Sequence, residues 1–332
     1  MIEPKKGPDN NLGFVIIGRN EGERLKQCLD SVLDYRETVV YVDSGSSDGS
    51  VELARELGIE VVRLDMSMAF TAARARNAGF DRLSQLSGSV EFVQFADGDC
   101  ELVEGWVEAA LNFLANNAQV AVVCGRRRER FPRASIYNML CDIEWDTPVG
   151  EAKACGGDAM MRVEAFKGVN GFCGDLIAGE EPELCVRLRQ NGWQVWRMNY
   201  EMTLHDAAIT AFSQWWSRSV RTGYAFIQGA FIHGASPEKH WVKETLRTWF
   251  WTVGIILSVV VLVLMFGAWG LTGLLLYPLQ VVRLGSKSNL DSKVKWSWAF
   301  FTVIGKFSEI LGQLKFLKNV FLQKPARLIE YK

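Results

Sequence analysis

The chain has 332 residues, of which 48% are hydrophobic and 23% charged, and its mean hydropathy is +0.03. This length can bury a full core, and the composition excludes a disordered protein, a collagen-like repeat and a disulfide-stapled miniprotein. The net charge of −1 conceals an uneven distribution, because 13 Lys and Arg face 5 Asp and Glu from Ser236 onward, whereas residues 1–235 carry 24 against 33. An acidic first part and a basic, apolar last part predict a globular domain tethered to a membrane, and no nucleic-acid partner.

Cysteine usage and the N-terminal residues bear on the compartment. Seven cysteines, an odd number with no C-x-x-C pair, favour a reducing compartment over a disulfide framework. The first residues are polar and contain no apolar signal core. We therefore expect residues 1–235 to stay in the cytosol.

The first half of the chain alternates between short apolar runs and amphipathic stretches. The apolar runs predict buried strands at residues 14–17, 39–42, 61–64, 92–96 and 120–124. Apolar residues at helical spacing predict helices at residues 25–33, 51–57, 74–83 and 106–114. This alternation predicts an α/β fold with a doubly wound, mostly parallel sheet, whose ligands bind beyond the carboxyl ends of the strands.

The second half is less regular until a long uncharged stretch. None of the 35 residues between Arg247 and Arg283 is charged. One helix of that length would measure ~52 Å at 1.5 Å per residue, against a hydrocarbon core of roughly 30 Å. A transmembrane hairpin (about 249–282) that turns at 267–270 fits better, and the basic flanks place both of its ends in the cytosol. A single tilted span is the alternative, although it would export a basic tail.

An amphipathic pattern follows the hairpin. Apolar residues form one stripe, at Phe300, Val303, Ile304, Phe307, Leu311 and Leu314, and the opposite face carries Lys306, Glu309 and Gln313. This pattern is typical of a helix lying in the membrane interface. The alternative is a third span in which Lys306 and Glu309 pair with each other.

These patterns divide the chain into four parts. We expect an N-terminal tail (1–11), a globular domain (12–235), a membrane-associated region (236–282) that contains the hairpin, and a basic tail (283–332) with the interfacial helix. The protein is then expected at the cytoplasmic membrane, with its globular domain on the cytosolic side.

Acidic residues follow two of the predicted strands. Asp97-Gly98-Asp99 leaves a buried strand and could present oxygen ligands to Mg²⁺ or Mn²⁺, although Asp-Gly is also ordinary turn chemistry. Asp43 ends another strand and could accept a hydrogen bond from a nucleobase, or it could cap its own turn.

Four further residues could belong to the same site. Arg76 could grip a phosphate, or it could be a solvated helical arginine. Glu180 and Glu181 precede a helix, where they could complement its dipole, or one of them could be a general base. His205 follows the predicted strand 194–198 and could ligate a metal or be a buried structural histidine.

Taken together and in this order, these motifs resemble those of the family-two glycosyltransferases, which have the GT-A fold. The resemblance covers Leu12 to Gly229 and rests on residues 14–21 (FVIIGRNE), 42–49 (VDSGSSDG), 75–79 (ARNAG), 97–99 (DGD) and 179–184 (GEEPEL). The membrane-anchored branch that acts in envelope or exopolysaccharide assembly is similar through the tail as well.

The resemblance implies roles for the residues of these motifs. Asp43 and Arg76 would hold the nucleotide sugar together with Asn20, Glu21 and Asp97. Asp99, with Asp97 and His205, would ligate Mn²⁺ or Mg²⁺. The family's usual base maps onto Glu181, where a glutamate replaces the commoner aspartate, so Glu180 stays an alternative. By analogy, Asp158 and Trp145 would line the acceptor side.

The function implied is an inverting, metal-dependent transfer of one sugar from a nucleotide sugar, with a UDP-sugar favoured, to a hydroxyl of a lipid-linked or saccharide acceptor. Two alternatives remain: a transferase that uses a polyprenyl phosphate as acceptor and needs no base, and a non-catalytic membrane scaffold that binds nucleotide sugars. Gln214 to Arg218 only loosely match the Gln-x-x-Arg-Trp motif of processive synthases, which weakens a polymerising function. A Rossmann dehydrogenase is disfavoured, since no G-x-G-x-x-G follows the first strand.

Overall fold

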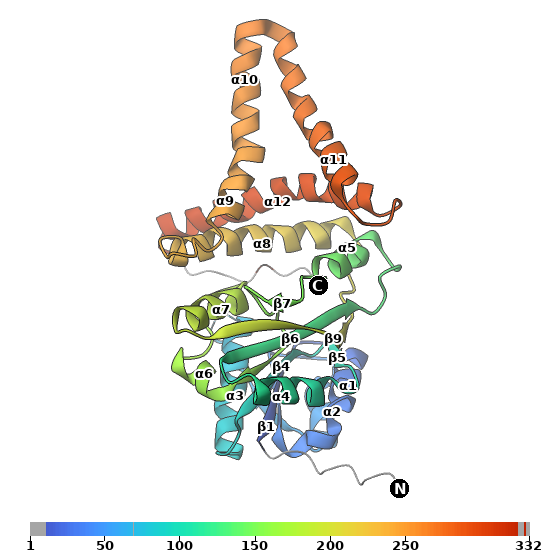
Figure 1. The fold of residues 1–332 in the computed structure, drawn as a ribbon, viewed down its shortest axis with the longest axis vertical. Helices are drawn as coiled ribbons and strands as arrows, with labels where there is room; N and C mark the ends of the chain where they lie inside the picture. Colours follow the sequence, from blue (N-terminus) through green and yellow to red (C-terminus); the bar gives the residue numbers. More distant parts are fainter. Residues whose placement is uncertain (1–10, 69, 325–328, 330–332) are drawn as a thin grey trace. The chain divides into compact units, whose positions relative to one another are not determined.

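The computed structural model describes residues 11–68, 70–324 and 329, and it contains two compact units, Met1–Ala208 and Ile209–Lys332 (Figure 1). The predicted N-terminal tail therefore lies outside the described residues except for Asn11, as do most residues at the end of the basic tail. The sequence placed the end of the globular domain at residue 235. In the structure, helix α8 (Phe212–His233) instead packs along α12 (Lys295–Phe321) within the second unit.

A nine-stranded sheet forms the centre of the first unit, in the order β3-β2-β1-β4-β8-β6-β9-β5, with β7 paired to β9. The strands are β1 (Leu12–Gly18), β2 (Val39–Asp43), β3 (Glu60–Arg63), β4 (Phe92–Asp97), β5 (Cys100–Leu102), β6 (Val120–Glu129), β7 (Gly150–Glu151), β8 (Ala159–Arg162) and β9 (Gln194–His205). All five apolar runs in the first half are strands, and β1, β2 and β4 are buried over nearly their whole length, as continuous apolar runs predict.

The sheet is parallel in one half and mixed in the other. Strands β3, β2, β1 and β4 pair in parallel, as predicted, and β6 pairs in parallel with β9. Strand β8 lies antiparallel between β4 and β6 because the chain enters it through a loop (152–158) rather than through a crossover helix. The α/β fold is therefore confirmed, with a mixed sheet in place of a mostly parallel one.

Seven helices and one 3₁₀ segment complete the described part of the first unit. They are α1 (Glu23–Asp30), a 3₁₀ segment (Leu33–Thr38), α2 (Ser50–Glu56), α3 (Ala72–Leu86), α4 (Trp106–Asn116), α5 (Ile136–Glu144), α6 (Val163–Gly168) and α7 (Glu180–Gln190). Helix α3 packs closely on β1 because residue 79 is glycine, where a Cβ would lie 2.4 Å from Val15 Cγ1. This packing fixes the helix that carries Arg76 against the central strand.

The second unit is helical and contains a hairpin (Figure 1). Helix α9 (Val242–Trp249) continues through a π-helical turn (Phe250–Gly254) into α10 (Ile255–Phe266), and a 3₁₀ segment (Gly267–Leu275) leads back into α11 (Leu276–Lys287). The chain reverses at Gly267, where φ is +59°, and the Tyr277 hydroxyl donates to the Trp251 carbonyl across the limbs. Among the described residues, one helical stretch, Val242–Lys287, is long and apolar enough to cross a membrane. The reversal at Gly267 matches the predicted hairpin.

Helix α12 packs through the face that the sequence marked as polar. Ser308, Glu309 and Gln313 are buried, whereas Phe300, Leu311 and Leu314 of the predicted apolar stripe are exposed. Glu309 accepts hydrogen bonds from Lys306 and from the Thr248 hydroxyl, at 2.7 Å and 2.6 Å. Only part of the predicted stripe points outward, since Val303 is buried.

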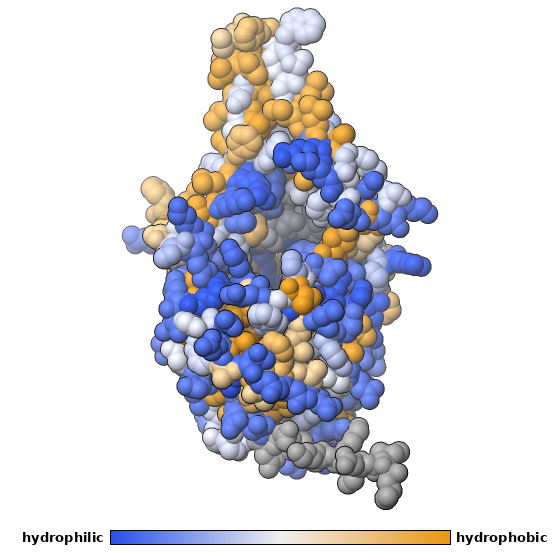
Figure 2. Space-filling view, viewed as in Figure 1, coloured by the Kyte–Doolittle hydropathy of each residue, from blue (hydrophilic) through white to orange (hydrophobic). Residues whose placement is uncertain are grey.

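Figure 2 shows apolar side chains gathered over the hairpin, and they include Leu257, Leu264, Met265, Phe266, Trp269 and Leu279. A water-soluble helical unit would bury such residues. The second unit therefore carries an outward apolar surface on both the hairpin and α12.

Candidate active site

The loops after β1 and β2 are joined at one edge of the sheet. Asn20 Oδ1 accepts a hydrogen bond from the Ser47 backbone N–H at 2.8 Å, and the Asn20 N–H donates to the Ser46 hydroxyl at 2.9 Å. Glu21 pairs with Arg24 at 2.8 Å. These contacts show that Asn20 and Glu21 shape the edge where a nucleotide was predicted to bind.

Asp43 lies at the end of β2 and is buried. Its carboxylate accepts hydrogen bonds from the backbone N–H groups of Gly45 and Ser46, at 3.1–3.3 Å. Asp43 thus orders its own turn, which was one of the two roles that its sequence context allowed. Because each carboxylate oxygen has further lone pairs, Asp43 can still accept a hydrogen bond from a ligand at the sheet edge.

Arg76 is buried and joins two acids that are distant in sequence. Its Nη1 lies 2.5 Å from Glu180 Oε1 and its Nη2 lies 2.6 Å from Asp97 Oδ1. Both terminal nitrogens therefore hold an acid, whereas a guanidinium has five N–H donors in all, so the predicted phosphate contact of Arg76 stays a prediction. Burial acts to raise the pKa of Asp97. The positive charges of Arg76 and Arg127 outweigh this effect, so the pKa of Asp97 is lower than usual.

A second arginine, Arg127 near the end of β6, is partly buried and also lies against Asp97. Its Nη2 is 2.8 Å from Asp158 Oδ2 and 3.5 Å from Asp97 Oδ2. Asp158 is 0% exposed and also accepts from the Asp97 N–H and the Thr203 hydroxyl. The predicted acceptor-side role of Asp158 is therefore corrected, because this carboxylate is enclosed by protein donors. It holds Asp97 in place by accepting from its backbone N–H.

Gly157 allows the loop before β8 to cover this cluster. A Cβ at residue 157 would lie 2.8 Å from Arg76 Nη2, 2.9 Å from Asp97 Oδ2 and 3.2 Å from Arg127 Nη2. A side chain at residue 157 would therefore displace the ends of these three side chains and disturb their ion pairs.

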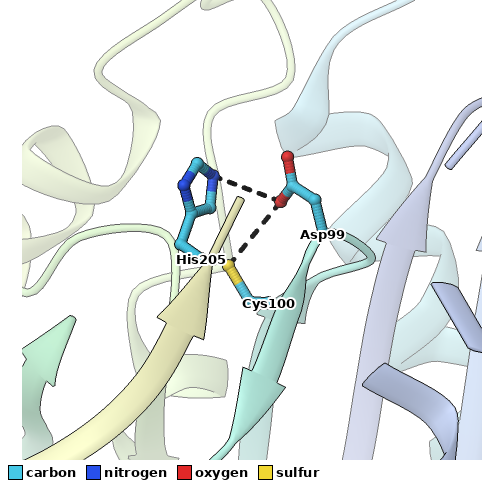
Figure 3. Close-up of side chains that lie close together, drawn as sticks. All are labelled: Asp99, Cys100 and His205. Carbon is cyan, nitrogen blue, oxygen red and sulfur yellow. Dashed lines mark hydrogen bonds and ion pairs between the residues drawn. The ribbon is translucent and has the colours of Figure 1, made fainter. Parts of the chain in front are cut away.

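Asp99 and His205 form a separate group (Figure 3). His205 Nε2 lies 3.3 Å from Asp99 Oδ1, and the Cys100 thiol lies 3.6 Å from the same oxygen. Burial lowers the pKa of His205, whereas the carboxylates of Asp99 and Glu129 raise it, with a net increase. Figure 3 shows His205 and Cys100 approaching Asp99 from the ends of β9 and β5.

This group fits a divalent cation. Single ligand atoms of Asp99, Cys100 and His205 lie within 4.8 Å of one another, and the same is true of Asp97, Cys100 and Asp158. Burial and nearby acids hold the pKa of the Cys100 thiol well above its usual value. A carboxylate with an imidazole suits a cation such as Mn²⁺, while a protonated thiol contributes little.

Glu181 lies at the start of α7 and is partly buried. Burial and the adjacent carboxylate of Glu180 raise its pKa to about 7, although Arg76 acts in the opposite direction. Glu180 itself is buried and ion-paired with Arg76. Of the two predicted candidates, Glu181 therefore has the properties of a base at neutral pH.

Trp145 borders both groups. Its ring lies beneath the Arg127 guanidinium, 5.4 Å from ring centroid to Cζ, and edge-on to His205 at 4.7 Å between centroids. This places Trp145 beside the cation group and leaves it partly exposed.

Sequence reasoning missed Arg127 and Glu129, which lie in the charged run 126–130. The run continues β6 beyond the apolar segment 120–124, and residues two apart on a strand share a face. That alternation is the signal that could have revealed them.

Comparisons with known proteins agree with this geometry. The family description "Glycosyl transferase family 2" matches residues 14–168. Glycosyltransferase AglE of Haloferax volcanii is 24% identical over 224 residues, which cover 63% of this chain and 70% of AglE. Succinoglycan biosynthesis protein ExoA of Rhizobium meliloti is 26% identical over 199 residues, which cover 55% of this chain and 59% of ExoA, less than two thirds of that relative.

Solved structures show the same fold. Mannosyltransferase PcManGT from Pyrobaculum calidifontis, in complex with GDP-Man and Mn²⁺, superposes with a TM-score of 0.60 at 16% identity, over 94% of this chain and 90% of that one. S. aureus TarS (residues 1–349) superposes with a TM-score of 0.51 at 15% identity, over 92% and 88%. At these identities the likeness concerns the fold, which is of the GT-A type.

Proposed function

Because the chain carries a glycosyltransferase family 2 domain and is a glycosyltransferase, we propose that it transfers one sugar from a nucleoside-diphosphate sugar to a hydroxyl of a membrane-associated acceptor, with inversion. The observation that carries this proposal is the environment of Glu181. A carboxylate with a pKa of about 7 is half ionised at neutral pH and can accept the proton of an attacking hydroxyl.

The cation group (Asp99, Cys100 and His205) would bind a divalent cation next to the diphosphate of the sugar donor. Asp99 and His205 would ligate Mn²⁺ or Mg²⁺, and Asp97, held by two arginines, would lie beside them. Such a cation, when bound, neutralises the charge that develops on a departing diphosphate. The Mn²⁺ bound in PcManGT supports this assignment.

The edge formed by the β1 and β2 loops is assigned to the nucleoside. Asp43, with Asn20 and Glu21 in the adjoining loop, would contact the base and ribose. The sequence favoured a UDP-sugar, and the GDP-Man in PcManGT adds GDP-mannose as a donor to be tested. Arg76 fixes Asp97 and Glu180, and its remaining N–H donors would contact a phosphate of the donor.

The second unit is assigned to the membrane. The apolar hairpin and the outward residues of α12 would insert from the cytosolic side, with α12 in the interface. The role of ExoA in succinoglycan biosynthesis supports an acceptor in envelope polysaccharide assembly, either lipid-linked or saccharide. Attachment to the membrane would raise the local concentration of such an acceptor.

One alternative acceptor is a polyprenyl phosphate, whose oxygen is already ionised and needs no base. The raised pKa of Glu181 favours the hydroxyl acceptor, because a hydroxyl has a proton for a base to remove and an ionised phosphate oxygen has none. The non-catalytic scaffold has less support, since the matched family is one of glycosyltransferases, and AglE and ExoA are a glycosyltransferase and a biosynthesis protein.

The test uses the full chain in detergent or nanodiscs, with a panel of UDP- and GDP-sugars, Mn²⁺ and two acceptor classes. Asp99→Ala should abolish turnover of every donor. Glu181→Gln should abolish transfer to a hydroxyl while sparing transfer to polyprenyl phosphate, and NMR of the product should show the inverted anomer. Glu201→Gln, at an exposed ion pair with Arg128, is the matched control and should be fully active. Normal hydroxyl transfer by Glu181→Gln would refute the proposal.

A further inference from the structure

His205 is held between two neighbouring strands. It ends β9, where its partner in the parallel strand β6 is Glu129 and its partner in the antiparallel strand β5 is Cys100. Its Nε2 faces Asp99 at 3.3 Å, and its Nδ1 faces Glu129 Oε2 at 3.7 Å. The two ring nitrogens therefore face two different carboxylates, of which only Asp99 belongs to the cation group.

The Glu129 carboxylate is fixed by other donors. Its Oε1 accepts from the Phe131 N–H and from the Asn138 amide, both at 3.0 Å, and its Oε2 accepts from the Ala207 N–H at 3.0 Å. The side chain is fully buried. These contacts aim a carboxylate oxygen at His205 Nδ1, a buried atom that otherwise has no hydrogen-bond partner.

We propose that Glu129 is a positioning residue that keeps His205 in the Nδ1–H tautomer, so that the Nε2 lone pair faces the cation site. This inference rests on the proposed cation-dependent function. An imidazole ligates a metal only through an unprotonated nitrogen, and an acceptor on the opposite nitrogen selects that tautomer and fixes the ring. A shift of a few tenths of an ångström brings Nδ1 within hydrogen-bond distance of Glu129.

Glu129→Gln separates this role from a purely structural one. The glutamine oxygen can replace Oε1, since it accepts from Phe131 and Asn138 in the same way. The amide NH₂ then replaces Oε2 and donates to His205 Nδ1, which favours the Nε2–H tautomer and removes the lone pair from the cation site. This NH₂ cannot accept from the Ala207 N–H, so the variant also loses one hydrogen bond of Glu129, and its control must lose one as well. The substitution thus changes the tautomer while leaving the Oε1 contacts in place.

The matched control is Asn138→Ala. It removes the Asn138 amide of helix α5, which donates to Glu129 Oε1 and to the Phe131 carbonyl, but it leaves Oε2 opposite His205. Mn²⁺ affinity, measured by the electron paramagnetic resonance signal of free Mn²⁺, should fall about tenfold or more in Glu129→Gln and stay within about threefold in Asn138→Ala. An unchanged affinity in Glu129→Gln, or an equal loss in Asn138→Ala, would overturn the proposal.

A second measurement is read from the wild-type chain, and a variant serves only to assign one resonance. The chain has three histidines, His205, His233 and His240, so ¹⁵N-labelled histidine gives few resonances, and His205→Gln identifies the relevant one. With saturating Mg²⁺, two-bond ¹H–¹⁵N spectra of the wild-type chain should show the Nδ1–H tautomer at His205. The Nε2–H tautomer would overturn the inference. A wild-type chain that binds neither Mn²⁺ nor Mg²⁺ would overturn the cation assignment itself, which distinguishes the two failures.

Discussion

Substitution of Glu180 should move the acid limb of the pH–rate profile. In the wild-type chain Glu181 must lose its proton to act as a base, so turnover should rise with pH and level off above its pKa of about 7. After burial, the adjacent Glu180 carboxylate is the largest cause of that raised pKa. Glu180→Gln removes this repulsion and frees Arg76 from one of its two acids. Both effects favour the ionised form of Glu181, so its pKa should fall.

The size of the effect follows from the ionised fraction. With a pKa of about 7, roughly a tenth of Glu181 is ionised at pH 6, and a decrease of about one unit would bring that to roughly half. Turnover at pH 6 should therefore gain about fivefold relative to its own plateau. The plateau itself should fall, because a weaker base accepts a proton less readily.

Initial rates of nucleotide release between pH 5 and pH 9, at saturating donor and Mn²⁺, measure this shift. Glu201→Gln should leave the midpoint unchanged. A midpoint that stays near 7 in Glu180→Gln, or moves upward, would refute the electrostatic explanation of the Glu181 pKa.

Three other predictions follow from contacts within each unit. Arg76→Met should lower the free energy of unfolding by about 3 kcal/mol in thermal or urea denaturation, because it leaves Asp97 and Glu180 near each other without a cation; a loss below 1 kcal/mol would contradict the role assigned to Arg76. Gly157→Ala should reduce turnover at least tenfold, because its Cβ would displace the guanidinium of Arg76, whereas Gly168→Ala, where a Cβ meets nothing within 4 Å, should be close to wild type. Leu264→Glu, on the exposed hairpin, should weaken co-flotation with anionic liposomes, whereas Leu86→Glu, at an exposed position of the first unit, should not; equal flotation of both variants would argue against insertion of the hairpin.

The sequence predicted the strands well because their signal is local. A run such as Phe14–Ile17 is buried on both faces, and the residue types alone express that burial. The acidic turns after β2 and β4 were expected at one edge of the sheet, and the pairing of Gly18 with Asp43 and of Ile17 with Asp97 places them on either side of β1. Hydrophobic periodicity and the rules of sheet topology were therefore enough to predict the strands and the edge at which the acidic turns lie.

The partners of the charged residues were not predictable in the same way. Arg76 lies 21 residues from Asp97 and 104 from Glu180, and no local pattern encodes such pairs. Asp158 was placed on the acceptor side by analogy with the family, yet Arg127 and Thr203 contact its buried carboxylate. For helix α12 the amphipathic pattern identified two faces without showing which of them meets protein, and Glu309 and Gln313 of the polar face are buried.

The distribution of charge within the site separates the two chemical tasks. Among the described residues, the ion pairs of Arg76 and Arg127 engage Asp97, Asp158 and Glu180, so these three acids are compensated by guanidinium groups. Within the residues that the structure describes, neither arginine forms an ion pair with Asp99 or with Glu181. Asp99 faces His205, whose Nε2 could ligate the same cation. The pKa of Glu181 is raised to about 7. Of these five carboxylates, one is thus suited to hold a cation and another to accept a proton, which is the division that the proposed sugar transfer to a hydroxyl requires.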